Sequence, residues 1–315
     1  MQISRTNIFY VLLLLLALLA PWVGVYPIFL MTIICYAIFA CAFNLMLGYS
    51  GMLSFGHAAY FGVSSYVTAW LLTANAWSTA GALLVGALAS TLLGLLIGLI
   101  AIRRSGIYFA MITLALAQLV YFVCLQAPFT GGENGIQGVP RGDLFGLISL
   151  TDDLSMYYFV VIVFVLIFLL IQRIVHSPFG QILKAIRENE PRAESLGYFA
   201  DHQKLLVFVL SSTLAGLAGS LKTLVLGFAT LSDVLQSTSG EVILMTMLGG
   251  AGTFFGPVLG SAIVVALQNL LSDRVGSWVT VIIGAIFVIC VMAFRRGIVG
   301  EWLAYQDRKR STSAT

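Results

Sequence analysis

Long apolar runs, separated by short polar or glycine-rich stretches, make up most of the chain. A helix that crosses a bilayer needs about 20 predominantly apolar residues, because its backbone polar groups must all be bonded inside the helix. About ten segments approach this requirement. They lie near residues 8–26, 28–47, 55–74, 79–101, 106–127, 156–175, 204–227, 240–254, 256–272 and 276–293. The pattern predicts an all-α protein, a polytopic membrane bundle of about 8–10 transmembrane segments that forms one domain over residues 1–315.

The composition agrees with a lipid environment. Hydrophobic residues make up 60% of the chain and charged residues only 9%, whereas a soluble domain carries about 25% charged residues. Disorder is excluded by so much apolar surface, and the small net charge of +3 offers no basic domain for nucleic acid. The four cysteines all fall in apolar runs, so neither a disulfide framework nor a CxxC metal site is predicted.

Two of the apolar segments need separate comment. Residues 8–26 resemble a secretory signal, but Pro21 stands where cleavage after Ala20 requires a small residue, so an uncleaved span is predicted. Residues 240–254 are short for a straight crossing and end in Gly249, Gly250 and Gly252. A broken or re-entrant helix is predicted there, and both a crossing and a re-entry remain open.

The positions of lysine and arginine predict the orientation, because these residues accumulate in short cytoplasmic loops. With the N-terminus inside, 13 of the 16 fall on one side. They are Arg5, Arg103, Arg104, Arg173, Lys184, Arg187, Arg192, Lys204, Arg295, Arg296, Arg308, Lys309 and Arg310. Both termini are therefore predicted to be cytoplasmic, provided that 240–254 counts as a crossing.

Two stretches outside the spans are long enough to have functions of their own. Residues 128–155 are predicted to form an external loop, in which glycines and Pro140 favour turns. Residues 177–203 are predicted to be a cytoplasmic helical segment that starts at Ser177 and Pro178 and stops at Gly197. Its apolar residues follow the spacing of one helical face: Phe179, Ile182, Leu183 and Ile186.

Catalytic chemistry finds little support in the sequence. The three histidines are far apart and include no pair with metal-ligand spacing, so no metal site is predicted. Residues 219–223 superficially resemble a phosphate-binding loop, but Leu221 replaces the glycine that must precede the lysine. Lys222 itself is expected to extend to the outer membrane interface, with Glu241 as an alternative partner.

Small residues spaced by four occur as Ser54, Ala58 and Gly62, as Gly252, Gly256 and Gly260, and as Gly94 with Gly98. Such rows allow membrane helices to approach closely, and ordinary packing is the simpler interpretation. Glycines also break the apolar runs at residues 48–57 and 249–257, and paired breaks favour a translocation pathway. The candidate pathway residues are Asn44, Ser54, Gly56, His57, Gly250, Gly252 and Gly256.

Four separated stretches then carry a specific resemblance: Asn44 to Gly62, Thr130-Gly131-Gly132 to Pro140, Phe179 to Gly197, and Phe294-Arg295-Arg296-Gly297-Ile298. In this order they strongly resemble the LivM-type permeases of branched-chain amino acid ABC transporters. The resemblance covers nearly the whole chain. It implies a non-enzymatic importer subunit in the bacterial inner membrane.

The resemblance also implies partners: a LivH-like second permease, two ATP-binding cassette ATPases and a periplasmic substrate-binding protein. It implies no cofactor on this chain, because ATP and Mg would be bound by the ATPases. The cytoplasmic segment resembles the part that docks on the ATPase, with Asn189 in place of the usual acid. The implied coupling residues are Phe179, Gly180, Leu183, Ala185, Ile186, Arg187, Glu188 and Gly197.

Alternatives remain at this point. Relatives of the family move urea, short amides or other amino acids, and the sequence offers no pocket to choose among these substrates. A stand-alone secondary transporter needs ion-coupling carboxylates in the spans, for which only Glu241 is a candidate. The segment 177–203 could also be a solvated basic loop without a docking role. A membrane enzyme is disfavoured, since no nucleophile, base and orienting group cluster.

Overall fold

The computed structural model describes residues 21, 26–75, 77–144, 148–293 and 297–301. The predicted span 8–26 and both chain ends lie almost wholly outside these residues. The helices are α2 (Pro27–Ser50), α3 (His57–Ala74), α4 (Thr79–Ala101), α5 (Ile107–Gln126), α6 (Asp153–His176), α7 (Pro178–Glu188), α8 (Glu190–Ser195), α9 (Ala200–Leu226), α10 (Gln236–Gly249), α11 (Gly256–Val275) and α12 (Val279–Ala293). Each predicted segment from 28–47 onward coincides with one of these helices.

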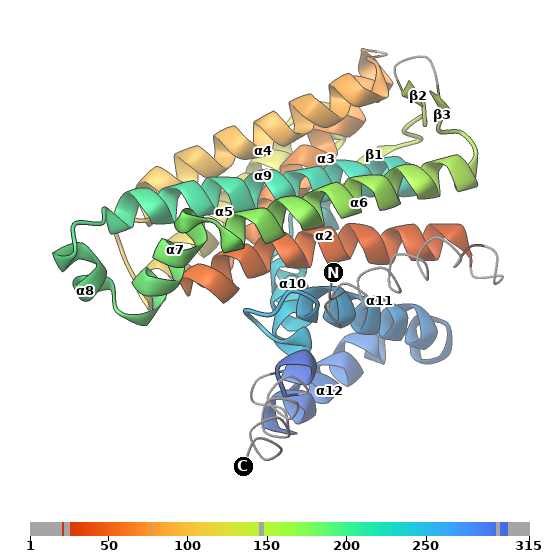
Figure 1. Ribbon diagram of the computed structural model, residues 1–315. Coiled ribbons are helices and arrows are strands. Elements are labelled where there is room, and N and C mark those ends of the chain that lie inside the picture. Colours follow the sequence, from red (N-terminus) through yellow and green to blue (C-terminus); the bar gives the residue numbers. More distant parts are fainter. Residues whose placement is uncertain (1–20, 22–25, 76, 145–147, 294–296, 302–315) are drawn as a thin grey trace, which may run out of the picture.

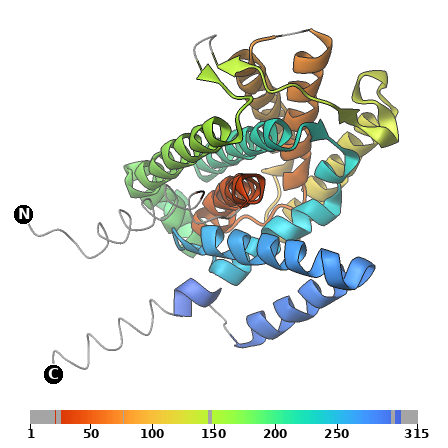
Figure 2. The same ribbon diagram turned by 90° about the vertical axis from the view of Figure 1, so that its right-hand side faces the viewer.

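The fold is an all-α polytopic membrane bundle, as predicted. In the described part of the chain, α2, α4, α5, α6 and α9 are long and apolar enough to cross a bilayer. These long helices run side by side, with α7 and α8 at one end of the bundle and β2 (Asp143–Leu144) and β3 (Ile148–Ser149) at the other (Figure 1). Seen along the helix axes, α2 lies in the middle, with other helices around it (Figure 2).

The outward faces of the peripheral helices are apolar. On α4 the exposed side chains repeat at helical spacing: Leu84, Leu88, Leu92, Leu96 and Leu99. On α5, Leu119, Phe122 and Val123 are also exposed. Exposure of such a surface to water is unfavourable in free energy, whereas contact with lipid or with another membrane subunit is not.

The rows of small residues lie at helix contacts. A Cβ on Gly86 would be 2.6 Å from the Ser220 hydroxyl, so α4 and α9 approach closely at this point. Gly94 faces Ser212, and Gly98 faces Phe208, both of which belong to α9. Hydroxyl pairs join the same helices, such as Thr91 with Thr213 at 2.8 Å. The packing interpretation of Gly94 and Gly98 is confirmed.

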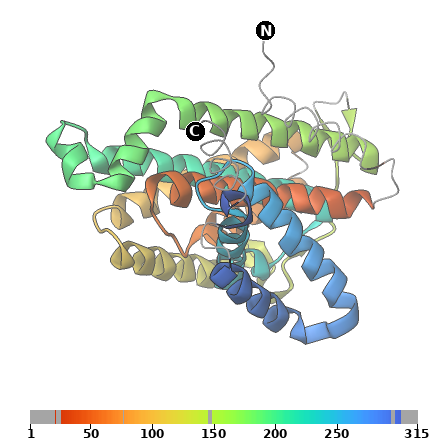
Figure 3. The same ribbon diagram turned by 60° about the horizontal axis from the view of Figure 1, so that its bottom comes forward.

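Helix α10 runs crosswise to the long helices and passes beside α2 near the middle of its length (Figure 1). It bonds to earlier helices through hydroxyls: Ser239 accepts from the backbone N–H of Ala58 at 2.9 Å, and Thr246 donates to the carbonyl of Ala40 at 3.4 Å. From the crossing, α11 runs toward the β2 end and α12 returns (Figure 3). The short segment is therefore a broken helix that does not cross the bundle lengthwise.

The predicted loop 128–155 is ordered where the structure describes it. It contains the 3₁₀ turns η2 (Pro128–Thr130) and η3 (Gly132–Asn134), and β1 (Ile136–Gln137) pairs antiparallel with β4 (Phe228–Ala229). Strands β2 and β3 form a second antiparallel pair. Arg141 fixes the loop to the bundle, since it donates to the carbonyls of Leu224 and Val225 and pairs with Asp153 at 2.6 Å.

Lys222 does not extend to the interface. Its ammonium lies 2.8 and 2.9 Å from the carboxylate oxygens of Asp233, and both side chains are only 5% exposed. The ammonium also lies 4.6 Å from the ring centre of Phe228. The expected Lys222 position and its alternative partner, Glu241, were both wrong. The reason is local: after α9 the chain turns back through β4 and η4 (Leu231–Asp233), which brings Asp233 onto α9.

Candidate functional site

The two glycine breaks lie against each other in the structure. Asn44 of α2 joins them: its side-chain amide donates to the carbonyl of Thr253 at 2.9 Å and accepts from the N–H of Gly252 at 2.8 Å. Asn44 is 3% exposed. A buried side chain that satisfies both its donor and its acceptor fixes geometry well. The pathway residues Asn44 and Gly252 are thus brought together although 208 positions separate them.

Glycine is required at this contact. A Cβ on Gly48 would lie 2.5 Å from the nitrogen and 2.9 Å from the Cα of Gly252. Gly250 and Gly252 have φ of 120° and 81°, which side-chain-bearing residues rarely adopt. Helix α2 ends at Gly51, whose φ is 75° and whose N–H bonds to the carbonyl of Leu47. A non-helical stretch, residues 51–56, then leads to α3.

The other predicted pathway residues also make contacts inside the bundle. His57 is fully buried, and its Nε2 lies 2.9 Å from the Ser211 hydroxyl, which itself donates to the carbonyl of Ala42 at 2.5 Å. Ser54 is fully buried and accepts from the N–H of Gly56 at 3.2 Å. Gly256 donates its N–H to the hydroxyl of Thr253 at 3.1 Å. These contacts fix the start of α3 and the start of α11.

The predicted cytoplasmic helix is two helices. Helix α7 ends at Glu188, and Asn189 begins α8 by accepting from the N–H of Arg192 at 3.1 Å. Pro191 supplies the physical reason, since its ring and missing N–H prevent a helix from continuing through this position. The single helix expected up to Gly197 was therefore wrong. Gly197 follows α8 with φ of 90° and is exposed.

The predicted apolar face of α7 is confirmed. Leu183 and Ile186 are buried, and Phe179 and Ile182 are half-buried. Gly180 is buried because it lies directly against the carbonyls of Ile174 and Val175 at the end of α6. The opposite face carries exposed residues at helical spacing: Gln181, Ala185 and Glu188. One face of α7 is thus attached to the bundle and the other is free.

Arg187 connects α7 to both glycine breaks. Its guanidinium donates to the carbonyl of Gly48, and its Cγ would lie 3.1 Å from a Cβ on Gly51. The same guanidinium would lie 3.4 Å from a Cβ on Gly252. Arg187 is exposed, yet its guanidinium reaches a backbone carbonyl because α2 ends beside α7. Nothing near Arg187 in the sequence indicates this contact.

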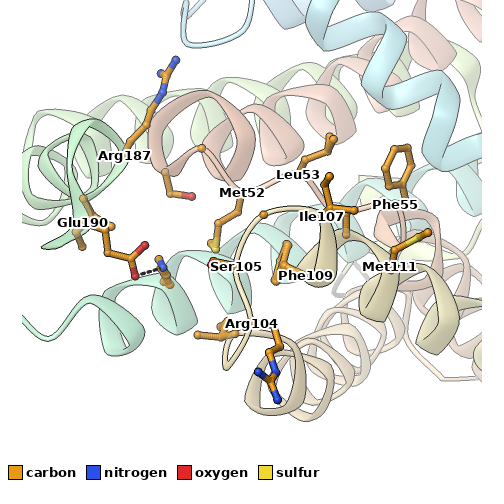
Figure 4. Close-up of a pocket in the computed structure, with 17 residues that line it drawn as sticks. Met52, Leu53, Phe55, Arg104, Ser105, Ile107, Phe109, Met111, Arg187 and Glu190 are labelled. Atoms are coloured by element: carbon orange, nitrogen blue, oxygen red, sulfur yellow. Dashed lines mark hydrogen bonds and ion pairs between the residues drawn. The ribbon is translucent and has the colours of Figure 1, made fainter.

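A cavity of about 610 Å³ opens beside these residues at the α7 end. Its walls come from the non-helical stretch after α2, from the turn between α4 and α5, from the start of α5, and from α7 to α9 (Figure 4). Sequence analysis missed most of its lining residues, among them Met52, Leu53, Phe55, Ser105 and Phe109. The one sequence feature that could have indicated them is their location, because they flank a glycine break and a turn that carries basic residues. In the described residues, no cluster of His, Cys, Asp or Glu could hold a metal ion.

Replacing Gly48 with alanine is expected to lower the free energy of unfolding by about 1–3 kcal/mol, because the added methyl overpacks the contact with Gly252. The matched control is Gly240→Ala in α10, where nothing lies within 4 Å of the added Cβ. That change should stabilise by about 0.5–1 kcal/mol. Thermal unfolding of the detergent-purified protein measures both. Equal midpoints for the two variants would contradict the contact.

Membrane-spanning helices around paired breaks, with an amphipathic helix attached at one end, define an integral membrane transport protein. The family model described as branched-chain amino acid transport system / permease component matches residues 25–291. The chain belongs to this family.

Individual proteins with similar sequences are also named as permeases. The high-affinity branched-chain amino acid transport system permease protein LivM of Escherichia coli is 29% identical over 295 residues, which cover 85% of this chain and 69% of the relative. A probable LivM of Methanocaldococcus jannaschii is 24% identical and covers 75% of this chain and 78% of its own. The fructose import permease protein FruG of Bifidobacterium longum is 28% identical over half of each chain. No solved structure matches the chain.

Proposed function

We propose that this chain is the permease subunit of an ABC importer for branched-chain amino acids. With a LivH-like second permease it forms the membrane pathway, a periplasmic binding protein delivers the substrate, and two separate ATPases hydrolyse ATP. The observation that carries the proposal is that α7 has one exposed face, while its Arg187 is bonded to Gly48 in one glycine break and lies close to Gly252 in the other.

In the proposed mechanism the ATPase binds the free face of α7. Its movement shifts α7 as a rigid body, because Leu183 and Ile186 are packed into the bundle and cannot slide independently. Arg187 passes the shift to Gly48 and Gly252, where the backbone can change its dihedral angles at least cost. Alternating access then follows from rocking about the two breaks.

The orientation forms part of the proposal. The α7 end is assigned to the cytoplasm and the β2 end to the periplasm of an inner membrane. The assignment is supported by the described basic residues of the α7 end: Arg103, Arg104, Arg173, Lys184, Arg187, Arg192 and Lys204. The cytoplasmic position predicted for both chain termini required 240–254 to be a full crossing; α10 does not cross the bundle lengthwise, so only the two ends of the bundle are assigned.

The substrate is proposed from the names of the relatives. Two LivM proteins are named for branched-chain amino acids, whereas FruG is named for fructose and is similar over only half the chain. Urea, short amides and other amino acids are the alternatives. Reconstitution of the co-purified complex in proteoliposomes with its binding protein tests them: uptake of leucine driven by ATP is expected. If the proteoliposomes took up only another substrate, the assignment of branched-chain amino acids would be refuted. If no ATPase co-purified with the chain, the assignment as an ABC importer would be refuted.

Docking on α7 predicts a specific loss. Ala185→Arg places a long charged side chain on the free face, where Ala185 is exposed, and is expected to reduce recovery of the ATPases at least tenfold in affinity purification. The cost of about 1.4 kcal/mol needed for this factor is small for a charge forced into an interface. The control is Ser149→Arg at the β2 end, where the residue is also exposed. Equal ATPase recovery from both variants would exclude α7 as the docking site.

A further inference from the structure

The cavity at the α7 end has walls built from the parts that the proposed mechanism moves. The stretch from Ser50 to Phe55 forms one wall, and Ile186, Arg187 and Glu190 belong to the segment that binds the ATPase. Opposite them lies the turn from Arg104 to Ile107. A space bounded by moving elements changes size as they move, which is the behaviour expected of a translocation vestibule.

Most of the cavity lining is apolar. Met52, Leu53 and Phe109 line its wall, and Ile107 and Met111, which are largely exposed, line its open side (Figure 4). Its volume of about 610 Å³ falls in the usual range for a small-molecule site, about 300–1,000 Å³. A ligand of many hydroxyls would lose hydrogen bonds to water against these side chains without replacement. The lining therefore favours a compact apolar group.

One end of the cavity carries an ion pair. Lys204 of α9 pairs with Glu190 of α8, and their side chains are 9% and 34% exposed. Figure 4 shows the pair at the end of the cavity away from Phe55 and Met111, whereas the side chains of Arg104 and Arg187 point out of the cavity. The guanidinium of Arg187 already donates to Gly48. Lys204 and Glu190 are thus the charged groups placed to meet a ligand.

A zwitterion matches such a pair group by group. Its carboxylate can accept from Lys204 while its ammonium donates to Glu190, so that the buried Lys204 and the half-buried Glu190 each keep a partner when the pair opens. An apolar side chain of a few carbons then lies against Met52, Leu53 and Phe109. We infer that this cavity is an inner vestibule site for a zwitterionic amino acid with a compact apolar side chain. The inference rests on the proposed function and adds the site and its recognition groups.

Thiol protection tests the site in the complete, nucleotide-free transporter. Ser105→Cys places a thiol in the lining, Cys35, Cys41 and Cys124 are buried, and the fourth native cysteine, Cys290, is replaced by serine in every variant. In inside-out vesicles, leucine is expected to slow labelling by a charged thiol reagent at least fivefold. Fructose and urea should not slow it. Met52→Cys is the second position if Ser105→Cys does not assemble.

Ligand fragments separate recognition of charge from simple blocking. 4-Methylpentanoate lacks the ammonium and 3-methylbutylamine lacks the carboxylate, so neither should protect the unmodified ion pair. Glu190→Gln frees Lys204 and should make 4-methylpentanoate protective. Lys204→Met frees Glu190 and should make 3-methylbutylamine protective. A merely structural ion pair would not produce this exchange of ligand preference.

The control thiol is Arg173→Cys, which is exposed at the same end of the bundle but outside the cavity. Its labelling should not respond to leucine. Unchanged labelling of both cavity thiols, in a complex that still transports leucine, would overturn the vestibule site and leave the importer intact. Equal protection by leucine and fructose would also overturn it. If the native complex did not transport leucine at all, the proposed function would be refuted instead.

Discussion

Replacing Lys222 with methionine is expected to lower the free energy of unfolding by about 3–5 kcal/mol, the range observed when one partner of a buried ion pair is removed. The carboxylate of Asp233 is 5% exposed and would lose its cation. It would keep the N–H of Thr230, which donates to it at 3.1 Å, but one neutral donor does not replace a charge. The thermal unfolding midpoint of the purified protein in detergent measures the loss.

The matched control removes both charges. In Lys222→Met with Asp233→Asn, the new amide oxygen can still accept from Thr230, and no buried charge remains. This double variant should recover most of the stability lost by the single one. A double variant as unstable as the single would show that packing of the Lys222 stem, and not the unpaired charge, causes the loss.

In the proposed importer, replacing Arg187 with alanine is expected to lower leucine transport more than tenfold while the ATPases remain bound and continue to hydrolyse ATP. The guanidinium joins α7 to the Gly48 carbonyl, whereas the proposed docking face at Ala185 stays intact. Arg187→Lys should restore transport only in part, because an ammonium on a flexible stem lacks the planar fork. The measurement is the number of leucine molecules transported per ATP hydrolysed in proteoliposomes.

Arg192→Ala is the control for Arg187. It removes the same charge from the neighbouring α8, where Arg192 is exposed. Transport per ATP should be unchanged in this variant. If both variants reduce the ratio equally, the charge of the segment matters and the bond to Gly48 does not.

The sequence predicted the helices well and their contacts poorly, for reasons visible at single residues. Apolar length is a local property, so the spans from 28–47 onward coincide with helices. The glycine breaks were also found locally, yet nothing near Asn44 in sequence indicates that it bonds to Thr253. Lys222 was misplaced because Asp233, 11 positions later, reaches it through the turn of β4 and η4, which the apolar pattern does not reveal.

Some features of the candidate site could likewise be predicted from the sequence and others could not. The buried face of α7 follows from the spacing of Leu183 and Ile186, which any isolated helix shows. The break at Asn189 could have been predicted from Pro191, since a proline disfavours the preceding helical turn. The cavity could not be predicted, because its walls come from segments that lie far apart in the chain.

The crosswise helix α10 also constrains how the protein can be made. With 14 residues it is too short to insert as an independent span. Its Ser239 and Thr246 bond to Ala58 and Ala40, so these partners must already be in the membrane when α10 enters. Synthesis from the N-terminus supplies them in that order. The chain from α10 onward, about a quarter of its length, is thus inserted against helices that are already in the membrane. Substitutions that disrupt α2 or α3 would therefore impair the insertion of segments synthesised much later.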